Sequence, residues 1–146
     1  MSNLEVVDIL LVEDSEADAE MTIRALNKHN LGNKLTWVRD GVEAIDFIYC
    51  RGSYSDRSNG YPKLILLDIK MPKMSGIEVL QKLKSDESTK KIPVVVLTSS
   101  AEGADVTAAY QLGVNSYLIK PVGFDAFMTV VAQAGMYWTL MNKVPN

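Results

Sequence analysis

Five short apolar runs, separated by longer amphipathic stretches, constrain the fold of this chain more than any other feature. Strands are expected at Val6–Val12, Leu35–Val38, Leu64–Leu67, Val94–Leu97 and Tyr117–Ile119. Three of these runs are continuous blocks of Val, Ile and Leu, without the alternation typical of a half-exposed strand. Continuous apolar strands are typical of parallel sheets that are covered on both faces. The pattern therefore predicts a buried parallel sheet.

The stretches between the runs have the apolar period of amphipathic helices. Helices are expected at Glu16–Asn30, Gly41–Arg51, Ser75–Asp86, Glu102–Leu112 and Phe124–Met141. The apolar stripes of the second and fourth helices are expected to include Val42 and Tyr110. Pairs of capping-box form or a near variant precede the first four helices. These pairs are Ser15 and Asp18, Asp40 and Glu43, Ser75 and Glu78, and Ser99 and Glu102.

Strict alternation of strands and helices predicts an α/β fold. Five strands are too few for an eight-stranded barrel, which leaves an open, doubly wound sheet. We expect a (βα)5 sandwich with a parallel sheet in the order 2-1-3-4-5, a flavodoxin-like arrangement. Residues 1–146 are expected to form a single domain, with a core at about residues 6–142 and no output domain. The polar segment Arg51–Pro62 is expected to be a solvated connection.

Composition excludes several classes of function. The net charge of −3 argues against a nucleic-acid-binding surface. Cys50 is the single cysteine, so no internal disulfide can form. No apolar stretch approaches the ~18 residues of a membrane span, and the start of the chain lacks the features of a signal peptide. A cytoplasmic protein without a membrane partner is the expectation.

Functional side chains follow four of the five strands. Glu13 and Asp14 end the first strand, Asp68 the third, Thr98 the fourth and Lys120 the fifth. In an open α/β sheet, ligands bind outside the carboxyl ends of the strands. The topology therefore predicts that three carboxylates, a hydroxyl and an ammonium lie together at one edge of the sheet.

The charge of this group favours a divalent cation. Three carboxylates and one ammonium leave two negative charges, which one divalent ion balances. Carboxylate oxygens favour Mg²⁺ over zinc, and the chain has only His29 and Cys50 as typical zinc ligands. A bound cation would also offset the repulsion between the adjacent acids Glu13 and Asp14.

A metal-bound carboxylate beside a lysine and a threonine is suited to phosphoryl transfer. Asp68 is the expected nucleophile, forming an acyl phosphate, while Lys120 and Thr98 each hold a phosphoryl oxygen. The competing interpretation is that each acid only caps a helix. A flavin-binding electron carrier of the same fold would need a glycine- and hydroxyl-rich loop in place of "EDSEAD". An aspartate-nucleophile phosphatase would need a second acid where Lys70 stands.

With these motifs, the chain resembles the receiver domain of two-component response regulators from about Val6 to about Trp138. "LLVEDS" is similar to the acidic-pair motif of that family, and "LILLDIKMPKMSG" to its phosphoacceptor motif around Asp68. "VVVLTSS", "YLIKP" and "RDGVEA" match further motifs of the family. With its insertion at Arg51–Pro62 and no output domain, the chain is similar to stand-alone receivers that pair with phytochrome-like histidine kinases.

The resemblance implies a sensor histidine kinase as partner, with Asp68 accepting phosphate from its phosphohistidine and becoming 4-aspartylphosphate. The protein would catalyse only its own phosphorylation and dephosphorylation. The resemblance also implies a bound Mg²⁺, for which Mn²⁺ can substitute. Asp14, Asp68 and the backbone carbonyl of Lys70 would hold this ion, and Glu13 would act through water. A site of this kind is a signalling module and not a conventional enzyme.

The resemblance also implies a switch in which Thr98 and Tyr117 move together after phosphorylation, and a cis peptide bond between Lys120 and Pro121. Ser99 and Gly123 depart from common residues of the family.

The last expected helix has a second apolar set in addition to its core stripe. That set is Val130, Tyr137, Leu140 and Met141. It is consistent with a homodimer or partner surface formed with the fourth helix and fifth strand, or with packing against the protein's own sheet. The sequence leaves both interpretations open, and it does not identify the stimulus or the target.

Overall fold

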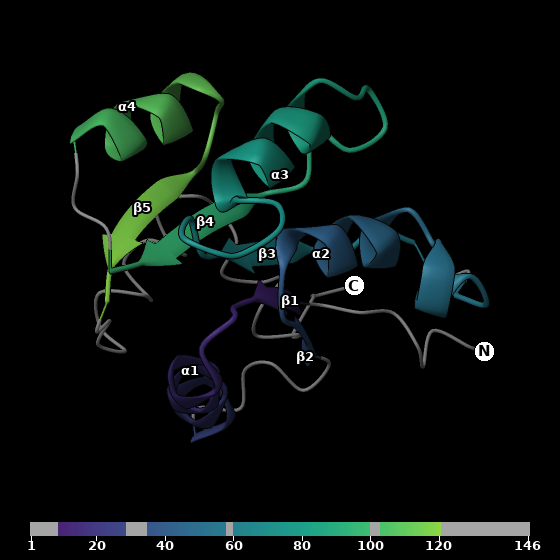
Figure 1. Ribbon diagram of the computed structural model, residues 1–146, viewed down its shortest axis with the longest axis horizontal. Coiled ribbons are helices and arrows are strands. Elements are labelled where there is room, and N and C mark those ends of the chain that lie inside the picture. The colour runs from purple at the N-terminus through teal and green to yellow at the C-terminus, as the bar shows by residue number, and fades with distance from the viewer. Residues whose placement is uncertain (1–8, 29–34, 58–59, 100–102, 121–146) are drawn as a thin grey trace, which may run out of the picture.

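The computed structural model describes residues 9–28, 35–57, 60–99 and 103–120 (Figure 1). Within these ranges, five parallel strands form one sheet in the order β2-β1-β3-β4-β5, which confirms the predicted topology. The strands are β1 (Ile9–Val12), β2 (Leu35–Val38), β3 (Leu64–Leu67), β4 (Val94–Thr98) and β5 (Ser116–Ile119). The expected start of the first strand at residues 6–8 lies outside the described residues.

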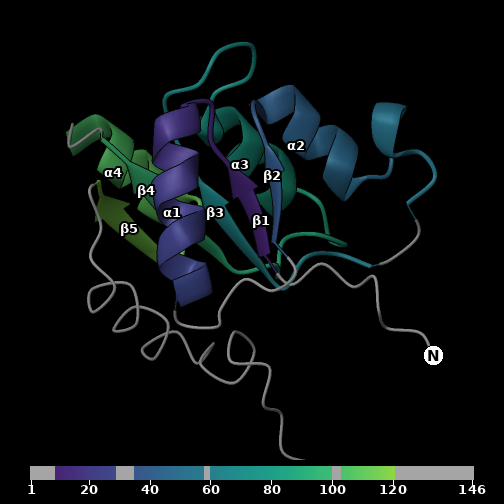
Figure 2. The same ribbon diagram turned by 90° about the horizontal axis from the view of Figure 1, so that it is seen from below.

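Helices cover the sheet on both faces (Figure 2). On one face lies α1 (Glu16–Lys28), and on the other lie α2 (Gly41–Ile48), α3 (Gly76–Lys84) and α4 (Gly103–Gln111). The expected last helix at residues 124–141, with its second apolar set, lies outside the described residues. None of the described helices is both long and apolar enough to cross a membrane.

Strand side chains divide between two apolar layers because successive residues of a strand point to opposite faces of the sheet. The layer beneath α1 contains Ile9, Leu11, Leu64, Leu66, Val95 and Leu97. The layer beneath α2, α3 and α4 contains Leu10, Val12, Ile65, Leu67, Val94 and Val96. All of these side chains are buried, as the continuous apolar runs predicted.

Two residues expected on apolar helix stripes are instead exposed. Val42 is 43% exposed, because α2 turns Ala44, Ile45 and Ile48 toward the sheet. Tyr110 is 50% exposed, since Ala109, its neighbour on α4, faces the core. The prediction was wrong at both positions.

The second helix is shorter than predicted, and the segment after it is more ordered. It ends at Ile48, and Cys50 takes a left-handed backbone with φ of 57°. A short 3-10 helix, η2 (Gly52–Tyr54), follows. The Tyr54 hydroxyl donates to Glu43 Oε2 over 2.6 Å, and the Arg57 guanidinium lies 4.0 Å from the Phe47 ring centre. The prediction of a solvated connection at Arg51–Pro62 is therefore wrong for Tyr54 and Arg57. These two side chains attach the segment to α2.

Candidate functional site

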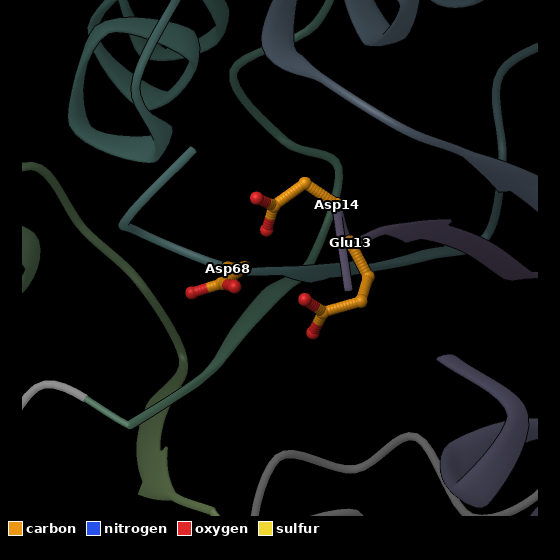
Figure 3. A group of neighbouring side chains, drawn as sticks. All are labelled: Glu13, Asp14 and Asp68. Atoms are coloured by element: carbon orange, nitrogen blue, oxygen red, sulfur yellow. The ribbon is translucent and has the colours of Figure 1, made fainter. Parts of the chain in front are cut away.

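The ends of β1 and β3 bring three acids together (Figure 3). The two strands are adjacent, with Val12 paired to Leu67, and the Asp68 N–H donates to the Val12 carbonyl over 3.0 Å. As a result, carboxylate oxygens of Glu13, Asp14 and Asp68 all lie within 4.8 Å of one another. Asp68 and Glu13 are buried, whereas Asp14 is exposed.

Glu13 is held in place through both its carboxylate and its backbone carbonyl. The Ser15 N–H donates to Glu13 Oε2 over 3.1 Å, and the indole N–H of Trp37 donates to the Glu13 carbonyl over 2.8 Å. Burial raises the pKa of Glu13 to about 7, and the negative charge of Asp68 adds to this, although hydrogen bonds from Lys120 and Ser15 oppose it. The charge of Glu13 therefore responds to pH near neutrality.

Lys120 supplies the positive charge of the site. It follows β5, and its N–H donates to the Thr98 carbonyl over 2.8 Å. Its Nζ lies 2.9 Å from Glu13 Oε1, 2.7 Å from Asp18 Oδ2 and 3.5 Å from Asp68 Oδ2. Burial alone would lower the pKa of Lys120, but the hydrogen bonds to Asp18 and Glu13, together with the negative charges of Asp68 and Glu13, outweigh it and raise this pKa. The ammonium therefore stays charged in neutral solution.

The loop after β3 orients the Asp68 carboxylate. The Lys70 N–H donates to Asp68 Oδ1 over 3.2 Å, while Oδ2 faces Lys120. The Lys70 ammonium lies 3.6 Å from Asp105 Oδ2 on α4, so this loop is also linked to that helix. The two oxygens of Asp68 thus have different neighbours.

Thr98 and Tyr117 lie on the same face of the sheet. Thr98 is fully buried at the end of β4, two residues after Val96. Tyr117, on β5, pairs with Val96 of β4. Both Val96 and Tyr117 pack in the layer beneath α2, α3 and α4, and alternation along β4 places Thr98 on this side too. Their coupled movement remains a prediction. Pro121, and with it the expected cis peptide bond, lies outside the described residues.

The donor set is suited to a hard divalent cation. Among the described residues, Glu13, Asp14 and Asp68 form the one group of three or more potential His, Cys, Asp or Glu ligands. All of its donors are carboxylate oxygens, which favour Mg²⁺ or Mn²⁺ over zinc. Lys120 balances the negative charge of these acids only in part, which also favours a bound cation.

Two residues at the site were not identified from the sequence. Asp18 was interpreted only as the partner of Ser15 in a pair of capping-box form, yet its carboxylate lies 2.7 Å from Lys120. Its place in the first turn of a helix that begins at the carboxyl edge of the sheet could have indicated this. Trp37 contacts Glu13 from β2, and no sequence motif marked it.

The chain is similar to known regulatory proteins in both sequence and structure. Residues 9–132 match the sequence profile of the response regulator receiver domain. A probable methanogenesis regulatory protein, FilR2 of Methanothrix harundinacea, is 39% identical over 138 residues, covering 94% of this chain and 87% of FilR2.

Similar proteins that are response regulators include Rcp1 and AtBRR. Rcp1 of Synechocystis sp. is 40% identical over 130 residues, covering 89% of this chain and 87% of Rcp1. Its Mn²⁺-bound crystal structure matches 95% of this chain and 97% of that chain with a TM-score of 0.76 and 39% identity. The bacteriophytochrome response regulator AtBRR matches 95% of this chain and 99% of its own, with a TM-score of 0.84 and 45% identity.

Proposed function

The chain belongs to the response regulator receiver domain family, and from this premise we propose that Asp68 accepts a phosphoryl group from a histidine kinase. The protein then signals through a changed surface. It is a signalling module that catalyses only its own phosphorylation and dephosphorylation.

The environment of Asp68 carries this proposal. Its carboxylate is buried and lies between two further acids and one ammonium. One oxygen accepts from the Lys70 N–H, and the other faces Lys120. A nucleophile held in this way has little orientational freedom to lose during phosphoryl transfer, where positioning and charge neutralisation supply most of the catalysis.

Phosphoryl transfer to Asp68 exchanges a P–N bond of the donor for a P–O bond. An Asp68 carboxylate oxygen forms a bond to phosphorus while the P–N bond of phosphohistidine breaks. The electron pair stays on the departing ring nitrogen, and neutral imidazole is released when the other ring nitrogen carries the proton. Lys120 and Thr98 hold oxygens of the transferred group.

The acids fit the divalent cation that the family implies. Asp14, Asp68 and the Lys70 carbonyl would hold Mg²⁺ or Mn²⁺ directly, with Glu13 acting through water. The bound ion would neutralise negative charge shared by the acids and the phosphoryl oxygens.

The proposed output is a movement of Thr98 and Tyr117 that alters the surface of α4 and β5. A dianionic group on Asp68 would attract the Thr98 hydroxyl and make room for the Tyr117 ring. Tyr110 on α4 and Ile119 on β5 are large apolar side chains exposed on these two elements. Their exposure supports a homodimer or partner contact there, which sedimentation velocity before and after phosphorylation would test.

The proposed kinase is of the phytochrome type. Support comes from the match to AtBRR, a bacteriophytochrome response regulator, which is higher in identity than the match to FilR2. Purified phytochrome-like and unrelated histidine kinases should transfer phosphate to this chain at rates that differ by orders of magnitude. Equal rates would contradict this assignment without affecting the role of Asp68.

Intact mass measurement after incubation with Mg²⁺ and phosphoramidate tests the acceptor. We expect one added phosphoryl group that alkali removes, and no addition in EDTA or in Asp68→Asn. Asp56→Asn, which makes the same change at an exposed aspartate, should be labelled like the wild type. Labelling that persists in Asp68→Asn would place the acceptor elsewhere.

A further inference from the structure

Lys120 is shared between the phosphoacceptor and α1. An ammonium has three N–H donors, and Lys120 has three carboxylate neighbours within 3.5 Å. The shortest contact, 2.7 Å, is to Asp18, and the longest, 3.5 Å, is to Asp68. The ammonium therefore lies closer to α1 than to the residue that is proposed to carry the phosphoryl group.

The Asp18 carboxylate is available for this contact because Glu13, and not Asp18, accepts the hydrogen bond from the Ser15 N–H. In a capping box, the third helical residue would accept from the N–H of the capping residue. Here the Ser15 N–H donates to Glu13 Oε2, whereas Ser15 Oγ still accepts from the Asp18 N–H over 3.2 Å. The backbone of Asp18 is thus fixed at the start of α1 while its side chain reaches Lys120.

We propose that Asp18 is a positioning residue that holds the Lys120 ammonium toward α1 and competes for it with the phosphoryl group on Asp68. This inference rests on the proposed function. A phosphoryl dianion must draw Lys120 away from Asp18, so the negative charge at position 18 weakens the affinity of the site for anionic phosphodonors. The contact sets how readily the site is phosphorylated.

The rate of phosphorylation by phosphoramidate in Mg²⁺, measured against donor concentration, tests the proposal. Asp18→Asn should raise the second-order rate constant about three- to fivefold, the scale of a partly exposed ion pair, mainly by lowering the half-saturating concentration. Asp18→Glu keeps the charge and should stay near the wild type. Glu20→Gln removes an exposed acid from the same helix and should also leave the rate near the wild type.

A metal-free measurement separates this inference from the proposed function. The nitrogen resonance of the Lys120 ammonium, identified by its loss in Lys120→Arg, should shift in Asp18→Asn and not in Glu20→Gln. An unchanged or lower rate constant in Asp18→Asn, or an equal rise in Glu20→Gln, overturns the inference while Asp68 remains the acceptor. Absence of label on wild-type Asp68 instead overturns the proposed function.

Discussion

Gly76 lies against the backbone of Asp68 so closely that a Cβ atom at position 76 would be 2.2 Å from the Asp68 carbonyl oxygen. Its N–H donates to the Ile69 carbonyl over 2.9 Å. Ser75 and Glu78 form a complete capping box that begins α3 at this point. The start of α3 therefore supports the backbone of Asp68 and Ile69 directly, and only glycine fits at this contact.

Gly76→Ala should destabilise the protein by about 1–3 kcal/mol, because the added methyl group meets backbone that cannot move aside. It should also slow phosphorylation of Asp68 by displacing the acceptor. Urea unfolding and the phosphoramidate assay measure the two effects. Gly103→Ala, at an α4 position with nothing within 4 Å of an added Cβ, should leave stability unchanged or raise it by up to ~1 kcal/mol. Equal losses in both variants would contradict the steric explanation.

The sheet could be predicted from sequence because its signal is local and strong. Continuous apolar runs such as Leu64–Leu67 have no exposed face in a parallel sheet, and crossover rules then limit the topology. The buried faces of the helices were less predictable. The small residues Gly41 and Ala44 of α2 are buried, whereas apolar periodicity predicted that the larger Val42 would be. The contacts of Tyr54 and Arg57 depend on tertiary structure, which composition of the loop does not encode.

At the site, strand ends predicted which residues meet but not how their contacts are shared. Glu13, Asp14, Asp68 and Lys120 come together because the edge of a parallel sheet collects them. The distance from Lys120 Nζ to Asp18 is less than 1 Å shorter than its distance to Asp68. This difference depends on side-chain geometry that no sequence motif describes.

Tyr54→Phe tests whether the segment after α2 is anchored. Loss of the hydrogen bond to Glu43 should cost about 1 kcal/mol of the free energy of unfolding, since Glu43 still accepts from the Arg39 N–H. Tyr61→Phe, at an exposed residue nearby, should change little. Urea unfolding measures both variants, and a stability of Tyr54→Phe equal to that of Tyr61→Phe would show that the contact contributes nothing.

Glu13 should make stability depend on pH in the absence of divalent metal. Its pKa is raised from 4.5 to about 7 in the folded protein, chiefly by burial, so the folded state binds more protons than the unfolded state between these values. The contribution of Glu13 is therefore fully present below about pH 4.5 and is lost as pH rises through about 7, by up to about 1.4 kcal/mol per pH unit. The raised pKa of Lys120 adds stability that is lost only in strongly alkaline solution.

Unfolding by urea in EDTA, repeated between about pH 5 and pH 8 for the wild type and Glu13→Gln, measures this dependence. The free energy of the wild type should fall across this range relative to that of the variant, which cannot titrate at position 13. Parallel curves would show that Glu13 keeps an ordinary pKa in the folded protein.

Asp14→Asn should stabilise the metal-free protein while weakening its response to Mg²⁺. Asp14 has a carboxylate oxygen within 4.8 Å of those of Glu13 and Asp68, so removing its charge relieves repulsion by roughly 0.5–1 kcal/mol. Mg²⁺ in the millimolar range should raise the Tm of the wild type, because an ion that binds only the folded state stabilises it. Asp56→Asn, at an exposed aspartate outside the cluster, should respond to Mg²⁺ like the wild type. If Mg²⁺ raises the Tm of Asp14→Asn as much as that of Asp56→Asn, then Asp14 is not a ligand, and its charge at the end of β1 needs another explanation.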